Sequence, residues 1–163
     1  MIYPMKTCLK TNSPEETVKV ADSIGRRLKG GEIFVLISDL GGGKTTFTRG
    51  LASAIGSHDE VSSPSFTLSH LYKGGDLTIH HYDFYRLPDI GLMREELEEV
   101  LEEEQSVVVI EWPKEVETSL PANRMIKVHI SRQKESEDVR NMCFEVSDSL
   151  EDIIEHIAEA VRC

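Results

Sequence analysis

Basic residues are scarce in this sequence. Eighteen Lys and Arg stand against 29 Asp and Glu over 163 residues, which gives a formal net charge of -11 and a pI near 5.0. Because affinity for a nucleic-acid backbone depends on neutralising phosphates with Lys and Arg, an extended surface for direct binding of RNA or DNA is not expected. The charge balance is compatible with a small, local basic site.

Cysteine is also rare, and long apolar runs are missing. Cys8, Cys143 and Cys163 are odd in number and form no C-x-x-C pair, so the sequence suggests neither a disulfide framework nor a zinc site. No apolar stretch approaches the roughly 18 residues that a membrane span needs, and the first residues contain no apolar leader segment. We therefore expect a reduced, soluble, cytoplasmic protein with no membrane association.

The apolar residues that are present are sufficient for one core. Hydrophobic residues make up 39% of the chain, and neither a repeat nor a linker divides it, so we expect one domain over residues 1–163. Short unbroken apolar runs, typical of strands covered on both faces, alternate with segments of helical spacing. This pattern predicts an α/β fold, with a mixed central sheet flanked by helices and some antiparallel hairpins. The expected strands are 33–37, a segment ending at Tyr72, 77–82, 107–110, 125–130 and 142–146; the expected helices begin after Ser13, at Lys44, near Met93 and at about Ser149, the last reaching Val161.

The first expected helix has a clear start signal. Ser13, Pro14 and Glu16 have the spacing of a capping box with Pro at the first helical position. Gly30 and Gly31 are expected to end this helix, because glycine commonly follows the last helical turn.

The strongest functional signal is a glycine-rich turn at residues 38–43, between an expected strand and an expected helix. Gly43-Lys44-Thr45 matches the end of the phosphate-binding pattern G-x-x-x-x-G-K-[ST], although Ser38 stands where the pattern has its leading glycine. In such a loop the backbone amides and the helix start face phosphate oxygens, the lysine adds charge for the β- and γ-phosphates, and the threonine hydroxyl is placed to bind Mg²⁺. The sequence therefore predicts a P-loop NTPase fold.

Two carboxylates follow expected buried strands. Glu111 comes directly after residues 107–110, and Asp83 comes directly after residues 77–82. Either carboxylate is suited to orient Mg²⁺ or to polarise an attacking water. For one such residue alone, capping of the next helix or pairing with a lysine is the commoner role. The neighbouring phosphate loop favours the metal role for Glu111 and leaves the role of Asp83 open.

Four blocks of sequence go beyond the phosphate pattern. They are Asp39-Leu40-Gly41-Gly42-Gly43-Lys44-Thr45-Thr46-Phe47-Thr48-Arg49-Gly50-Leu51, Ser63-Pro64-Ser65-Phe66-Thr67-Leu68, His81-Tyr82-Asp83-Phe84-Tyr85-Arg86-Leu87 and Ile110-Glu111-Trp112-Pro113. In order and spacing, over about residues 10–130, the chain resembles the TsaE (YjeE) family, the small P-loop ATPases of bacterial tRNA threonylcarbamoyladenosine synthesis. The family usually has Gly at position 38, Ala at 42 and Thr at 65, where this chain has Ser38, Gly42 and Ser65.

The resemblance implies an ATPase that binds ATP and Mg²⁺, hydrolyses ATP slowly by itself, and acts with a TsaB–TsaD pair. That pair transfers a threonylcarbamoyl group to adenosine 37 of tRNAs that read ANN codons; ATP turnover would reset it between rounds, and tRNA would be met only indirectly. By position, Lys44 would be catalytic and bind phosphate, while Thr45 would bind Mg²⁺. Glu111 would complete the metal site, and Asp83 would be needed for hydrolysis and is a further candidate metal ligand. The resemblance puts Asp39, Leu40, Gly41, Gly42, Gly43, Lys44, Thr45, Thr46 and Trp112 at the nucleotide, Ser65 and Thr67 in a switch-like loop, and Ser13 near the adenine.

Two other classes of function are open on the residues alone. A small-molecule or nucleotide kinase would use the same loop, but such enzymes commonly have an Arg-rich lid, and few spare Arg residues lie between the loop and Glu111. A nucleotide-gated binding module, whose hydrolysis times its release from a partner, is close to the family function. A GTPase is disfavoured because no Asn-Lys-x-Asp element follows any expected strand.

Structural roles are favoured for the remaining polar features. His80 and His81 are adjacent, so in a strand they face opposite sides and cannot bind one metal together. Seven Glu residues lie at positions 95–104, and subtracting them leaves 22 acidic against 18 basic residues elsewhere, or -4. A solvated helix face is the favoured interpretation of this acidic segment, and a docking surface for a basic partner is the alternative.

Overall fold

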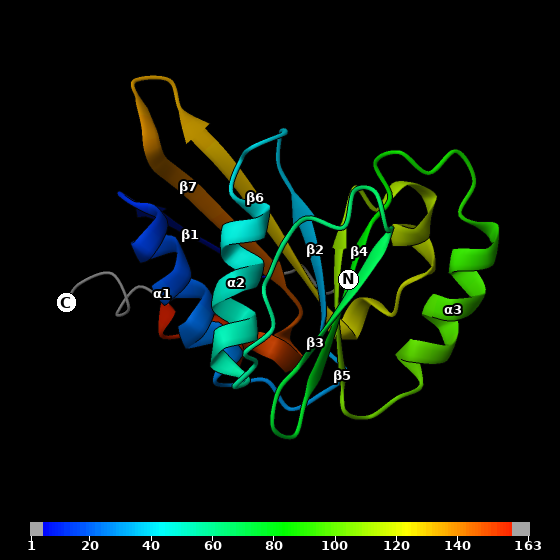
Figure 1. The fold of residues 1–163 in the computed structure, drawn as a ribbon. Helices are drawn as coiled ribbons and strands as arrows, with labels where there is room; N and C mark the ends of the chain where they lie inside the picture. Colours follow the sequence, from blue (N-terminus) through cyan, green and yellow to red (C-terminus); the bar gives the residue numbers. More distant parts are fainter. Residues whose placement is uncertain (1–4, 158–163) are drawn as a thin grey trace.

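A seven-stranded mixed sheet forms the centre of the protein, as a computed structural model that describes residues 5–157 shows (Figure 1). The strand order is β1-β7-β6-β2-β5-β4-β3. The four inner strands β6, β2, β5 and β4 pair in parallel, whereas β3, β7 and β1 add antiparallel pairs at the two edges. The strands are β1 (Met5–Thr11), β2 (Ile33–Ile37), β3 (Ser69–Lys73), β4 (Thr78–Asp83), β5 (Ser106–Glu111), β6 (Met125–Gln133) and β7 (Ser136–Val146).

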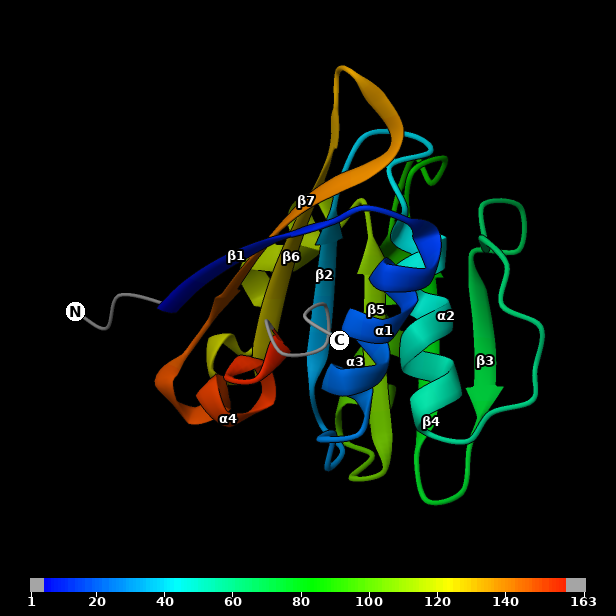
Figure 2. The same cartoon turned by 90° about the vertical axis from the view of Figure 1, so that its left-hand side faces the viewer.

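Helices cover both faces of this sheet. The α-helices are α1 (Pro14–Gly25), α2 (Lys44–Ala54), α3 (Gly91–Leu101) and α4 (Glu151–Ile154), with short 3-10 turns at Lys114–Ser119, Ala122–Arg124 and Asp148–Leu150. α1 and α2 lie side by side, as Figure 2 shows, and they pack against one face of the sheet. α3 packs against the opposite face.

The alternation of side chains along the strands divides the core into two layers. On β2, Phe34 and Leu36 face α1 and α2, whereas Ile33 and Val35 face α3. β5 divides in the same way, with Val107 and Val109 in the first layer and Val108 and Ile110 in the second. Both strands are therefore apolar without interruption, which is why the sequence signal for them was strong. The expected α/β class, with a mixed sheet, flanking helices and antiparallel hairpins, is confirmed.

The first helix ends earlier than the sequence predicted. α1 stops at Gly25 rather than at Gly30 and Gly31. The Glu32 carboxylate accepts hydrogen bonds from the backbone amides of Lys29 and Gly30, at 2.8 and 2.9 Å. These amides have a side-chain acceptor in place of helix carbonyls, so the segment after Gly25 is a turn that leads into β2.

The first strand and a disulfide were not predicted. β1 lies at the edge of the sheet, where its register with β7 sets Cys8 opposite Cys143 with their Cα atoms 4.1 Å apart. The two form a disulfide, so the expectation that the sequence contains none is wrong. Their separation of 135 residues hid the pair, since only the strand register brings them together. Cys163 lies outside the described residues.

The last part of the chain also differs from expectation. β6 and β7 are longer than the predicted strands 125–130 and 142–146, and they form an antiparallel hairpin that projects beyond the rest of the sheet (Figure 1). The closing helix expected over 149–161 is a 3-10 turn followed by α4, and positions 158–161 of that prediction lie outside the described residues.

The acidic segment is a solvated surface. All seven Glu side chains at positions 95–104 are exposed, while Leu97 and Val100 on the other side of α3 are buried in the core. α3 ends at Leu101, so the last three of these Glu residues follow the helix rather than belong to it. Among the helices in residues 5–157, none is long and apolar enough to cross a membrane.

The close packing of α1 on α2 yields a test of the fold. A Cβ atom added at Gly50 on α2 would lie 2.5 Å from the Ala21 Cβ and 2.6 Å from the Val18 carbonyl oxygen. We expect Gly50→Ala to lower the free energy of unfolding by about 1–3 kcal/mol, because the two helices would have to move apart. Gly75→Ala is the control, since nothing lies within 4 Å of its added Cβ. Urea unfolding measures both variants, and equal midpoints would contradict this account of the helix contact.

Candidate functional site

The candidate site lies where three parallel strands end. The carboxyl ends of β2, β5 and β4 meet at one edge of the sheet, which is the usual place for ligand sites in open α/β folds. The register pairs Glu111, the last residue of β5, with Leu36 on β2 and with Asp83 on β4. Both predicted carboxylates therefore stand beside the loop that follows β2.

The loop after β2 has the backbone conformation of a phosphate cradle. Gly41 and Gly43 have φ angles of +70° and +112°, in the left-handed region that glycine adopts without strain. α2 begins at Lys44, and the residue before it, Gly43, has no side chain to cap the helix. The first amides of α2 consequently lack a side-chain acceptor, and a helix start of this kind favours an anion.

The Ser38 side chain occupies the space that a side chain at position 42 would need. A Cβ atom added at Gly42 would lie 1.6 Å from the Ser38 Oγ and 2.9 Å from the Ser38 Cβ. The serine side chain thus fills the position of the methyl group that an alanine at 42 would add. A Cβ at 42 would also lie 2.9 Å from the Asp39 carbonyl oxygen, and Ser38 as it stands leaves no room for a methyl group there, so the two departures from the family pattern are compatible with each other.

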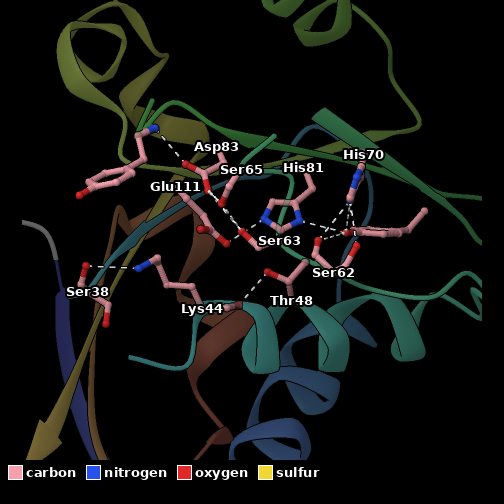
Figure 3. A network of polar contacts seen from close by, with 12 residues as sticks. Ser38, Lys44, Thr48, Ser62, Ser63, Ser65, His70, His81, Asp83 and Glu111 are labelled. Carbon is pink, nitrogen blue, oxygen red and sulfur yellow. Dashed lines mark hydrogen bonds and ion pairs between the residues drawn. The ribbon is translucent and has the colours of Figure 1, made fainter. Parts of the chain in front are cut away.

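Lys44 is a buried cation held by the loop. The residue is 6% exposed, and its Nζ donates to the carbonyl oxygen of Ser38 at 3.3 Å (Figure 3) and to that of Asp39 at 3.1 Å. The Nζ also lies 4.9 Å from the centroid of the Trp112 ring, within cation–π range. Burial lowers the pKa of Lys44, and the nearby carboxylates of Glu111 and Asp83 partly oppose that shift.

Asp83 connects the strand end to the loop at residues 61–67. Its Oδ2 accepts hydrogen bonds from the hydroxyls of Ser63 and Ser65, at 3.3 and 2.9 Å, and its Oδ1 accepts from the backbone amide of Tyr85 at 2.9 Å (Figure 3). The carboxylate is 3% exposed, so these bonds compensate its desolvation. Ser65 therefore keeps a hydroxyl contact although the family usually has Thr there.

Glu111 is held from one side only. Its Oε1 lies 2.9 Å from the Nε2 of the fully buried His81, and the residue is 2% exposed while lining the cleft (Figure 3). Its second oxygen, Oε2, makes no hydrogen bond with another described residue. Sequence analysis did not place His81 in the site. Strand alternation predicts that His80 and His81 face opposite sides of the sheet, but it does not predict which residues each side chain contacts.

Trp112 has an unusual backbone conformation. Its φ angle is +54°, which is strained for a residue with a bulky side chain and costs on the order of 1–3 kcal/mol. This conformation sets the indole between Lys44 and Tyr85, whose ring centroid lies 4.9 Å from that of Trp112. Backbone strain of this kind concentrates at functional sites, where the surrounding contacts maintain it.

Two arginines of the β6–β7 hairpin reach the same loop and were not predicted. Arg140 donates to the Gly42 carbonyl at 2.8 Å, and Arg132 donates to the Gly41 carbonyl at 2.6 and 3.2 Å. They face each other across the hairpin, where like charges repel, and Arg132 contributes to a lowered pKa of Arg140, after burial. The two arginines are 91 and 98 residues from the glycines that they contact, and only the fold of the hairpin brings them to the loop. Sequence analysis therefore did not predict these contacts.

The structure brings most of the predicted site residues around one cleft of about 280 Å³. Asp39 contributes its carbonyl to Lys44 instead of lining the cleft. Ser13 is the N-cap of α1, where its Oγ accepts from the Glu16 amide, and Thr67 donates to the Ser69 carbonyl; neither lines the cleft. The lining residues are Leu40, Gly41, Gly42, Gly43, Lys44, Thr45, Thr46, Ser63, Ser65, Asp83, Glu111, Trp112 and Arg140.

The donor set fits a nucleotide with Mg²⁺. Within residues 5–157, no group of three or more His, Cys, Asp or Glu side chains is arranged to hold a metal by itself. Mg²⁺ commonly takes one or two protein oxygens and completes its shell with phosphate and water. Thr45 and Glu111 line the cleft with side-chain oxygens that could hold a metal arriving with a phosphate, and Asp83 lies in the same cleft with both of its oxygens already hydrogen-bonded.

Comparisons with known proteins agree with this geometry. The family described as "Threonylcarbamoyl adenosine biosynthesis protein TsaE" matches residues 11–142. The tRNA threonylcarbamoyladenosine biosynthesis protein TsaE of Bacillus subtilis is 35% identical over 139 residues, which is 83% of this chain and 82% of that protein. The TsaE protein of Treponema pallidum is 36% identical over 115 residues, or 68% of this chain and 82% of that protein.

A solved structure is similar to this chain over nearly its whole length. The crystal structure of Bacillus subtilis YdiB superposes with a TM-score of 0.76 at 31% sequence identity, covering 98% of this chain and 97% of that chain. The match in sequence extends over most of the chain, and the match in structure extends over nearly all of it. The chain therefore belongs to the TsaE family of threonylcarbamoyl adenosine biosynthesis.

Proposed function

We propose that this protein is a Mg²⁺-dependent ATPase that hydrolyses ATP to ADP and phosphate in tRNA threonylcarbamoyladenosine synthesis. The observation that carries the proposal is the convergence of Lys44, Asp83 and Glu111 on the glycine-rich loop, at the shared edge of β2, β4 and β5. Membership in the TsaE family supports the same assignment. Nothing comparable to this convergence favours the kinase alternative, which would need an acceptor pocket beside the phosphates.

In the proposed reaction, a water oxygen forms a bond to the γ-phosphorus while the bond to the β–γ bridging oxygen breaks. ADP leaves, and the proton of the water passes to solvent or to a phosphate oxygen. The Lys44 ammonium would exchange its neutral carbonyl acceptors for phosphate oxygens, which form stronger, charge-assisted hydrogen bonds. The charge is then aimed at the oxygens on which negative charge grows in the transition state.

The two carboxylates have different tasks in this proposal. Thr45 and the free Oε2 of Glu111 would hold Mg²⁺, which supplies charge neutralisation at the phosphate oxygens when bound. Asp83 already uses both of its oxygens, on Ser63, Ser65 and the amide of Tyr85. It would therefore act through those groups, ordering the loop at residues 61–67 over the phosphates, and would reach the metal only after one of these bonds is exchanged.

The central test removes the buried cation. We expect Lys44→Ala to reduce phosphate release from ATP by about 100-fold or more, because the transition state loses its positioned positive charge. Lys134→Ala, an exposed change at the tip of the β6–β7 hairpin, should leave the rate within about twofold of wild type. Phosphate release at saturating Mg²⁺ measures both variants. Equal rates for the two would refute the ATPase assignment, and transfer of phosphate to a small acceptor would favour a kinase instead.

The shared space of Ser38 and Gly42 gives a second test. Gly42→Ala alone should weaken ATP binding by roughly tenfold, since the added methyl group collides with the Ser38 Oγ and distorts the loop. The double variant Ser38→Gly with Gly42→Ala removes the serine side chain and leaves only the Asp39 carbonyl oxygen, 2.9 Å from the added Cβ, to shift; it should bind ATP within about threefold of wild type. Quenching of the single tryptophan, Trp112, reports binding. If the two changes simply add, the steric conflict argued for these positions is wrong.

We further propose that the protein acts with a TsaB–TsaD-like heterodimer and meets tRNA only through it. Hydrolysis of ATP to ADP and phosphate does work only when it is coupled to another reaction, and the nucleotide state of the protein is a means of coupling. We expect the heterodimer to bind this protein at least about tenfold more tightly with a non-hydrolysable ATP analogue than with ADP. Calorimetric titration measures both affinities. Equal affinities, or the absence of binding, would exclude the partner proposal while leaving the ATPase assignment intact.

A further inference from the structure

His81 is a buried imidazole that the proposed phosphate chemistry does not use. It lies on β4 with no solvent exposure, on the face of the sheet that carries α2. Alternation along β4 puts its side chain on the same face as that of Asp83, two residues further on, and that face forms the floor of the cleft. A fully buried imidazole needs a hydrogen-bond partner for each of its two nitrogens, and the identity of these partners indicates its role.

Both ring nitrogens of His81 are engaged. Nε2 lies 2.9 Å from the Glu111 Oε1, and Nδ1 lies 3.1 Å from the Tyr72 hydroxyl. Tyr72 is itself buried, and its hydroxyl donates to the Ser62 carbonyl oxygen at 3.0 Å. A continuous chain of hydrogen bonds therefore runs from the loop at residues 61–67, through β3 and β4, to the carboxylate at the end of β5 (Figure 3).

This chain leaves Glu111 with one fixed and one available oxygen. The bond from Nε2 occupies Oε1, and the ring cannot turn without also losing Tyr72. Oε2 is then the oxygen directed to the cleft that Glu111 lines. Outer partners of this kind orient metal-binding carboxylates, and their removal commonly costs 10- to 100-fold in metal affinity or activity.

His80 provides an internal comparison. It is the neighbouring residue on the same strand, but its side chain faces the α3 side, where Nε2 lies 3.1 Å from the Ser106 Oγ and 3.6 Å from the Glu103 carboxylate. It does not line the cleft. The two histidines have the same side chain but face opposite sides of the sheet. Replacement of His80 therefore serves as a control for any effect of losing a histidine from β4 that does not involve Glu111.

We propose that His81 is a positioning residue that orients the Glu111 carboxylate so that Oε2 faces the phosphates and their metal, with Tyr72 holding the imidazole in turn. The inference rests on the proposed ATPase function and deepens it, because it names the group that sets the geometry of the metal-side carboxylate. It predicts an effect on the chemical step and on the metal, and little effect on the affinity for ATP itself.

The test compares two replacements of His81 with one of its neighbour. His81→Phe removes both hydrogen bonds and should lower kcat for ATP hydrolysis by about 10- to 100-fold while KM for ATP stays within about threefold. His81→Gln retains a donor in place of Nε2 and should recover part of that loss. His80→Gln should match wild type within about twofold. Tyr72→Phe keeps the ring and removes one hydroxyl, so it should lower kcat by about fivefold, and it carries the test if His81→Phe does not fold.

A second measurement is independent of turnover. The affinity for Mn²⁺, followed by electron paramagnetic resonance in the presence of a non-hydrolysable ATP analogue, should fall by about tenfold in His81→Phe and remain unchanged in His80→Gln. Equal losses in the Phe and Gln variants, an effect on KM alone, or unchanged Mn²⁺ binding would each overturn the positioning role. Hydrolysis that depends on Lys44 but not on His81 would overturn this inference and leave the ATPase assignment standing. A wild-type protein that hydrolyses no ATP would overturn both.

Discussion

The parallel register of β2, β5 and β4 is the constraint on which the site depends. It sets Glu111 beside Leu36 on one side and beside Asp83 on the other. A shift of one residue in β5 would turn the Glu111 side chain to the α3 face, away from Lys44, because strand side chains alternate. The apolar residues of β2 and β5 pack in both core layers and hold the two strands inside the sheet, and alternation along β5 puts Glu111 on the same face as Val107 and Val109. The same residues that stabilise the sheet therefore position the chemistry.

The site does not share the strong negative charge of the whole chain. The chain carries a formal charge of -11, yet Lys44 is buried in the cleft and Arg132 and Arg140 reach the loop from the hairpin. Buried Asp83 and Glu111 act as counter-charges to Lys44, while the two arginines donate to the loop carbonyls. The charged residues that line the cleft are two cations, Lys44 and Arg140, and two carboxylates, Asp83 and Glu111, and the seven exposed Glu residues at positions 95–104 lie outside it.

Sequence alone predicted the parts of the structure that local chemistry determines. The glycine-rich loop, the start of α2 and the carboxylates at the ends of two apolar strands each follow from neighbours in the chain. Contacts set by long-range register were not predictable: the disulfide of Cys8 with Cys143, and Arg132 and Arg140 over the loop. The early end of α1 has a local cause. The Glu32 carboxylate accepts hydrogen bonds from the amides of Lys29 and Gly30, which the sequence analysis had expected to belong to the helix.

The Tyr72 hydroxyl has a single proton and three neighbours able to accept it, of which the His70 Nδ1 at 3.4 Å is the most distant. Its oxygen lies 3.0 Å from the Ser62 carbonyl and 3.1 Å from the His81 Nδ1, and a carbonyl only accepts. The Ser62 carbonyl oxygen and the His81 imidazole, the two nearest of these neighbours, therefore compete for this hydrogen. If the phenol donates to His81 instead of Ser62, Nδ1 is the acceptor and the hydrogen of a neutral imidazole lies on Nε2, the nitrogen that faces Glu111. The position of one hydrogen in the core therefore connects the loop at residues 61–67 with the Glu111 carboxylate on β5, through side chains of β3 and β4.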